Sequence, residues 1–109
     1  MPTSAELVLC TCPDMDCAQR IASSLLDRRL AVCVSMLPGL ISMYRWEGAI
    51  EQSKEVLMLI KTTRDLYKEL EQAIVSQHPY ELPEIIAVPV ERGLAGYLAW
   101  VEKCTKTMT

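Results

Sequence analysis

The strongest constraint on the fold is a run of five consecutive apolar residues, Val56 to Ile60, within a segment whose composition is typical of a β-strand. Successive side chains of a strand point to opposite faces of the sheet, so this strand needs apolar cover on both faces. Helical spacing of apolar residues predicts two long helices, over 14–29 and from about 63 or 65 to 77. Two helices packed on one face would leave the other face uncovered.

The order of the remaining elements predicts the fold class. Strand patterns occupy 7–12, 31–47, 52–62 and 85–90, and a short helical face follows at 94–101. The resulting order β-α-β-β-α-β is the ferredoxin-like split arrangement, an α+β sandwich with both helices on one face of an antiparallel sheet. Asp16 followed by Gln19 fits a capping box for the first helix, and Pro89 predicts an edge position or a bulge for the last strand. No linker or repeat interrupts the chain, so we expect a single domain over 1–109.

The second strand is too long for a compact domain. Fully extended at ~3.3 Å per residue, Ala31 to Glu47 would span roughly 55 Å. A domain of this chain length has a radius of gyration near ~13 Å and is therefore only about 35 Å across. The strand must bend at Leu37-Pro38-Gly39 or project from the domain, and its end carries Tyr44 and Trp46, which are costly to leave in water. Together with the two-sided strand, this predicts a homo-oligomer built on sheet contacts.

Charge and composition exclude several classes of function. The formal net charge is −3 and acidic and basic residues are interleaved, which argues against nucleic acid and against an anionic membrane surface as partners. No apolar stretch is long enough for a transmembrane helix, and the first residues lack the features of a signal peptide. We therefore expect the five cysteines to be reduced thiols in a cytoplasmic protein.

Cys10 and Cys12 are the first candidates for chemistry. Positions i and i+2 of a strand face the same side, so the two sulfurs could hold one soft ion such as Cu(I). The alternative is that both are small buried hydrophobes, and for this pair alone the alternative is favoured.

His78 is the single histidine of the chain, and prolines at 79 and 83 stiffen the segment that follows it. An imidazole beside thiols would be a copper or zinc site. The alternative is that the ring caps the last carbonyls of the second helix, and spacing alone favours this alternative.

Three further residues have weaker signals. Lys61 and Thr63 lie where a strand enters a helix, and free N–H groups there could hold an anion, although capping by Thr63 is the more ordinary explanation. Glu84 could do acid–base work or bind a hard cation, or could be a solvated carboxylate. The chain has no glycine-rich phosphate loop and no GxSxG motif, so no enzyme is predicted.

Several motifs together resemble one known family. They occur in one order over 7–101, and they are LCTCPD (Leu9–Asp14), Pro38-Gly39, Tyr44-Arg45-Trp46-Glu47-Gly48, Ile60-Lys61-Thr62-Thr63, His78-Pro79-Tyr80 and Pro83-Glu84. The ordered set is similar to the CutA family of divalent-cation tolerance proteins.

The resemblance implies a ferredoxin-like homotrimer in the cytoplasm that is linked to tolerance of copper and other divalent cations. In bacterial members copper binding is assigned to the cysteine of the LCT motif and to two adjacent histidines before Pro-Tyr. The resemblance therefore implies metal ligation by Cys10 and His78, with copper, or zinc or another divalent cation, as the bound metal. Gln77 stands where the first of the two histidines would be, and Cys12 is the candidate auxiliary ligand that could compensate.

A second interpretation keeps the trimer and changes its role. Trimeric PII-type signalling proteins are similar in architecture, and by that analogy clefts between subunits would bind a small anion or a partner protein. The candidate cleft residues for this alternative are Lys61, Thr63, Glu84, Trp46 and Tyr80.

Overall fold

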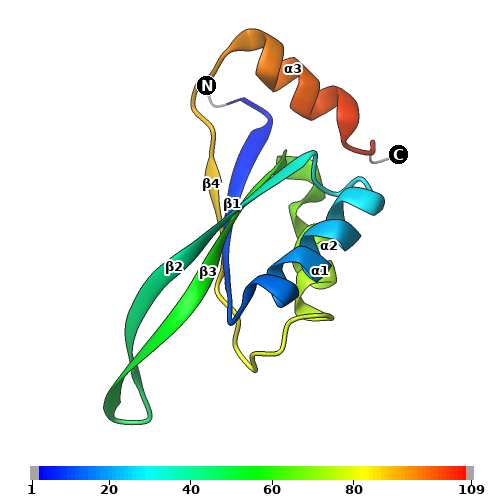
Figure 1. The fold of residues 1–109 in the computed structure, drawn as a ribbon. Helices are drawn as coiled ribbons and strands as arrows, with labels where there is room; N and C mark the ends of the chain where they lie inside the picture. The colour runs from blue at the N-terminus through cyan, green and yellow to red at the C-terminus, as the bar shows by residue number, and fades with distance from the viewer. Residues whose placement is uncertain (1–2, 108–109) are drawn as a thin grey trace.

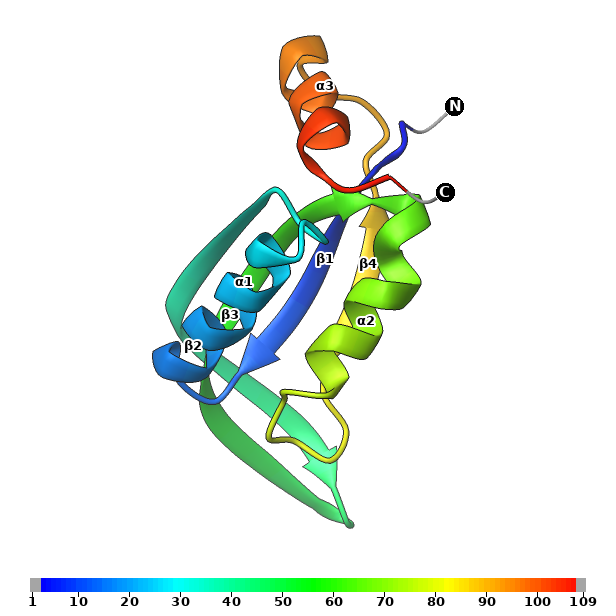
Figure 2. The same cartoon turned by 90° about the vertical axis from the view of Figure 1, so that its right-hand side faces the viewer.

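The computed structural model describes residues 3–107. Within that range the elements are β1 (Ala5–Cys12), α1 (Met15–Asp27), β2 (Cys33–Trp46), β3 (Ala49–Thr63), a 3-10 turn (Arg64–Leu66), α2 (Tyr67–Val75), β4 (Ile85–Pro89) and α3 (Ala95–Cys104). The strands form one antiparallel sheet in the order β2-β3-β1-β4. The helices α1 and α2 both lie on one face of it (Figures 1 and 2). This confirms the predicted ferredoxin-like α+β arrangement, with β4 and its Pro89 at a sheet edge as predicted.

The apolar run in β3 divides between the two faces of the sheet. Val56, Met58 and Ile60 are buried in the core beneath the helices, whereas Leu57 and Leu59 alternate to the opposite side and are only partly buried. In Figure 1 α3 lies across one end of the sheet and leaves that opposite face without a helix over it. We call this surface the open face. As expected, β3 therefore has apolar side chains on both faces of the sheet, and the helices cover only one of these faces.

The long hairpin both bends and projects. Pairing of β2 with β3 runs from Cys33↔Lys61 to Trp46↔Ala49. The register shifts by one residue between Leu37 and Leu40, where Pro38 and Gly39 both stand opposite Val56. Beyond this irregularity the two strands extend past the rest of the sheet (Figure 1), and the molecule measures 44 × 27 × 22 Å. A two-residue turn joins the strands. Both of its residues, Glu47 and Gly48, have positive φ (49° and 82°), which suits the right-handed twist of a hairpin.

The start of α1 differs from the prediction. Asp14 has an extended backbone and its Oδ1 accepts a hydrogen bond of 2.8 Å from the Cys17 N–H, so Asp14 is the N-cap. The predicted capping box at Asp16 and Gln19 is wrong, since Asp16 already lies in the first helical turn. The Asp14 cap fixes the start of α1 directly after β1, the strand that carries Cys10 and Cys12.

Candidate metal centre

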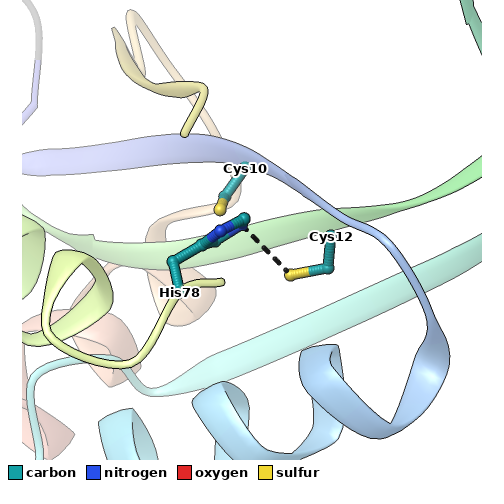
Figure 3. A group of neighbouring side chains, drawn as sticks. All are labelled: Cys10, Cys12 and His78. Atoms are coloured by element: carbon teal, nitrogen blue, oxygen red, sulfur yellow. Dashed lines mark hydrogen bonds between the residues drawn. The ribbon is translucent and has the colours of Figure 1, made fainter. Parts of the chain in front are cut away.

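Two thiols and one imidazole meet in the interior, between β1 and the end of α2. Cys10 and Cys12 belong to the core cluster beneath the helices and are completely buried. His78 follows the C-terminus of α2 and is also buried. One ligand atom from each of the three residues lies within 4.8 Å of the other two, and Figure 3 shows the imidazole beside both thiols. The structure thus brings together the three residues that the sequence analysis proposed as ligands.

The path of the chain after α2 turns the imidazole of His78 inward. The backbone N–H of His78 donates to the Ile74 carbonyl at 2.9 Å and closes the helix. The ring itself reaches β1, where Nε2 lies 2.8 Å from the Thr11 carbonyl oxygen. The alternative in which the ring caps α2 is therefore wrong, because the main chain closes the helix while the side chain bonds to a strand.

Both nitrogens of His78 have hydrogen-bond partners. Nδ1 lies 3.1 Å from the backbone nitrogen of Tyr80, which can only donate, so Nδ1 accepts. In the neutral imidazole the proton is then on Nε2, and this N–H donates to Thr11. The Cys12 Sγ is 3.8 Å from the same Nε2. A metal ion bound at Nε2 would take the place of that proton and of the hydrogen bond to Thr11.

A thioether adds a fourth soft donor. Met58 lies opposite Cys10 in the register of β1 and β3, and its Sδ is 3.5 Å from the Cys12 Sγ. Sequence reasoning missed Met58, because one methionine within five consecutive apolar residues is more simply explained as core packing. The sequence did indicate that Met58 belongs to a strand that could pair with the strand carrying the two cysteines. Only the register of that pairing shows that Met58 lies opposite Cys10.

The surroundings favour the protonated form of the Cys12 thiol. The contact with Cys10, followed by burial, raises the pKa of the Cys12 thiol far above its ordinary value. Burial is also the main reason that the pKa of Cys17, next to this pair, rises to about 11. Metals bind the thiolate, so an ion must displace protons to bind here. A metal bound here would therefore need a strong preference for sulfur.

The donor set fits a soft ion. Thiolate and thioether sulfurs favour Cu(I), and imidazole suits copper and zinc, whereas calcium and magnesium require several oxygen ligands. Within residues 3–107 no carboxylate joins this group, which is also the one cluster of three histidine, cysteine or acidic residues whose ligand atoms converge. The residues present are thus a plausible set for copper and a poor set for a hard cation.

Gln77 makes contacts with the helices. Its side-chain amide donates to the Ser24 hydroxyl at 3.1 Å and to the Ala73 carbonyl at 3.0 Å. The residue at the position of the first of the two histidines that the resemblance implies therefore joins α1 to the end of α2, and it lies outside the group of Cys10, Cys12 and His78.

Three of the predicted cleft residues line one cavity. Trp46, Tyr80 and Glu84 surround a volume of about 710 Å³, together with Glu55, which the sequence analysis did not single out. The Tyr80 hydroxyl donates to the Glu55 Oε2 at 2.7 Å. Burial, and then this hydrogen bond, raise the pKa of Tyr80 well above its ordinary value. The signal that could have identified Glu55 is a carboxylate directly before the apolar run of β3.

The other two predicted cleft residues lie elsewhere. Lys61 donates from Nζ to the Ser35 hydroxyl at 2.6 Å, on the open face of the sheet. Thr63 ends β3 beside a smaller hollow shared with Asp65 and Glu102, and its side chain makes no capping hydrogen bond. The expected cap by Thr63 is therefore wrong. Within one chain, Lys61 and Thr63 lie apart from the cavity lined by Trp46, Tyr80 and Glu84.

Comparison with known proteins identifies the family. Residues 6–104 match the CutA1 divalent ion tolerance protein family. The chain belongs to the CutA1 family. A divalent-cation tolerance protein CutA from Pectobacterium atrosepticum is 50% identical over 97 residues, which cover 89% of this chain and 88% of that protein. Mouse Protein CutA is 42% identical over 109 residues, and this chain spans 62% of the longer mouse protein.

Solved structures of CutA proteins share the fold. CutA from Xylella fastidiosa superposes with a TM-score of 0.93 at 41% identity, over 95% of this chain and all (100%) of that one. A protein described as the periplasmic divalent cation tolerance protein CutA from Archaeoglobus fulgidus gives a TM-score of 0.91 at 35% identity, over 94% and 99% of the two chains. The resemblance that the motifs suggested is thus confirmed, and with it a place among divalent-cation tolerance proteins. Within residues 3–107, no helix has the length and apolar character needed to cross a membrane.

Proposed function

We propose that this protein binds copper, as Cu(I), through Cys10, Cys12 and His78, with Met58 as a supporting thioether. The observation that carries the proposal is the convergence of these donors in a buried site, with one ligand atom from each of the first three residues within 4.8 Å of the others. When bound, the metal would be held out of water among thiolates, which suits sequestration or sensing. Within this proposal the role is binding, with no catalytic reaction.

The hydrogen bonds of His78 must be broken when a metal ion binds, so they set a minimum affinity that the metal must have. A metal at Nε2 moves the imidazole proton to Nδ1, where it would face the Tyr80 N–H, so the loop after α2 must adjust. An ion with only a moderate affinity for sulfur and nitrogen would not compensate for the lost hydrogen bonds. This arrangement therefore favours Cu(I) over Zn(II) at the same site.

The assembly is the second part of the proposal. The open face carries apolar side chains on all four strands, among them Leu9, Leu37, Leu57 and Ile86. Uncovered apolar surface of this extent is typical of an interface between copies. We propose a homotrimer joined through this face, as the family resemblance implies. Nucleic acid and membrane are not proposed as partners.

The cytoplasm is the proposed location because the site needs reduced thiols. The cysteines at 10 and 12 are free, as are the other three of the chain. In an oxidising compartment these side chains would be exposed to oxidation, which removes them as ligands.

Anaerobic titration with Cu(I), in competition with a chelator that binds Cu(I), tests the metal site. We expect one Cu(I) per chain and weaker binding of Cu(II) and Zn(II). The double variant Cys10→Ala/His78→Ala should lose more than about tenfold in Cu(I) affinity, since loss of even an outer-shell partner has an effect of that order.

Cys104→Ala is the matched control, because Cys104 is a free thiol outside the cluster. Its Cu(I) affinity should equal that of the parent, and circular dichroism should show that all variants are folded. Equal affinities for the parent and the folded double variant would remove Cys10 and His78 from the site and refute the proposal.

A further inference from the structure

The cavity beside the metal centre is large enough for a small molecule. Its volume is about 710 Å³, within the range of roughly 300–1,000 Å³ common for ligand pockets. One wall comes from the projecting part of the β2–β3 hairpin, and the other comes from the loop between α2 and β4. Its lining includes the side chains of Tyr44, Trp46, Glu55, Tyr80, Glu81 and Glu84.

The charged residues that line this cavity are all acidic. Its lining includes three carboxylates, Glu55, Glu81 and Glu84, and no lysine, arginine or histidine. Small anions such as phosphate or a carboxylic acid would be repelled by this lining. The occupant that fits the electrostatics is a cation.

Glu55 is the deepest of the three carboxylates. Its side chain belongs to a residue only 8% exposed, and its one hydrogen bond within residues 3–107 comes from the Tyr80 hydroxyl. The two ion pairs found in the same range both involve Glu69, so Glu55 has no basic partner there. A carboxylate that faces the cavity without a basic partner attracts a cation.

Aromatic side chains supply the rest of the wall. Tyr44, Trp46 and Tyr80 line the cavity, and Trp46 is 45% exposed on a hairpin that projects into solvent. Aromatic rings attract ammonium groups, and tryptophan does so most strongly. Aromatic and acidic groups in one pocket are the combination that recognises organic ammonium ions.

A single metal ion does not fit this arrangement. The oxygens of Glu55, Glu81 and Glu84 do not converge on one point, because the one converging cluster within the described residues is Cys10, Cys12 and His78. Three carboxylates that line one cavity without converging on a point suit a ligand that carries several positive charges at intervals. We propose that the cavity binds an aliphatic di- or polyamine, with one ammonium group at Glu55 and another toward Glu81 and Glu84.

Calorimetry with spermidine, on the full chain and at constant ionic strength, tests the proposal, and fluorescence of a Trp100→Phe variant, in which Trp46 is the remaining tryptophan, gives a second readout. Spermidine should bind one per chain, more tightly than the monoamine butylamine. Glu55→Gln keeps an acceptor for Tyr80 while removing the charge, and should weaken binding at least tenfold. Glu84→Gln alters an exposed side chain that folding does not need, and should also weaken binding.

Glu91→Gln is the matched control, because it removes the same charge from an exposed residue outside the cavity. Equal weakening by Glu91→Gln would show only a general attraction of polyamines to an acidic protein and would overturn the proposal. Absence of binding at millimolar spermidine would also overturn it, as expected if a second copy of the chain fills the cavity. Because these variants leave Cys10, Cys12 and His78 intact, the copper proposal stands or fails separately.

Discussion

At the residue scale, Met58 distinguishes a metal site from ordinary core packing. We predict that Met58→Leu lowers Cu(I) affinity by about tenfold, the order typical of groups that support a metal ligand. Leucine has a similar volume, so stability should change by less than about 1.5 kcal/mol. Met43→Leu, at a position 71% exposed on the hairpin, is the control and should leave affinity unchanged. Chelator competition with Cu(I) measures both variants, and identical affinities would leave Met58 a core residue only.

Tyr67 gives the protein a defined sensitivity to alkaline pH. Burial, and then the hydrogen bond that its hydroxyl donates to Glu71, raise the pKa of Tyr67 from 10.0 to about 12. The folded state therefore prefers the neutral phenol. The contribution of Tyr67 to stability is complete below pH 10 and is lost as the pH rises from about 10 toward 12.

The measurement compares urea unfolding of the parent and of Tyr67→Phe between pH 9 and pH 11. The difference in free energy of unfolding should narrow as the pH rises, since phenylalanine cannot ionise. Other tyrosines titrate in both proteins and cancel in the difference. A gap that stays constant over this range would mean that the Tyr67 phenol ionises equally in the folded and unfolded states.

At the element scale, the turn between β2 and β3 requires a positive φ, a backbone conformation that favours glycine. Gly48 has a φ of +82°, and a Cβ added there would meet nothing within 4 Å. Gly48→Ala should therefore destabilise through backbone strain alone, by about 1–2 kcal/mol. Gly96→Ala, in α3, also meets nothing, and should instead stabilise by up to about 1 kcal/mol through helix propensity. Thermal unfolding should shift in opposite directions for the two variants, and a shift of the same sign would contradict the backbone argument.

The helices and strands could be predicted from the sequence, but the contacts between them could not. The spacing of apolar residues differs between strands and helices, so the order of the elements could be predicted from the sequence. The two-residue repeat of a strand also placed Cys10 and Cys12 on the same side of β1. The meeting of these thiols with His78 depends on the route of the chain after α2, which no local pattern encodes. In the same way, the pairing of Met58 opposite Cys10 follows from a strand register that five equally apolar residues leave undetermined.

At the scale of the whole molecule, the open face should hold copies of the chain together. In β4, Ile85 and Ala87 pack against the core, so Ile86 and Val88 lie on the open face, where Ile86 is 51% exposed. A lysine there would place an unpaired charge in the proposed interface, a change that typically costs several kcal/mol. We predict that Ile86→Lys converts a trimer into monomers and makes the melting temperature depend less on concentration, because dissociation no longer accompanies unfolding.

Val75→Lys is the matched control, since Val75 is 53% exposed at the end of α2, on the helical side of the sheet. Light scattering of the parent and of this control should give three times the chain mass, and Ile86→Lys should give one. Because the same open face carries Leu37 and Leu57, Leu37→Lys should act like Ile86→Lys if the contact covers the face as a whole. If both substitutions on the open face leave the mass at three chains, the copies must meet elsewhere, and the uncovered strands would require another explanation.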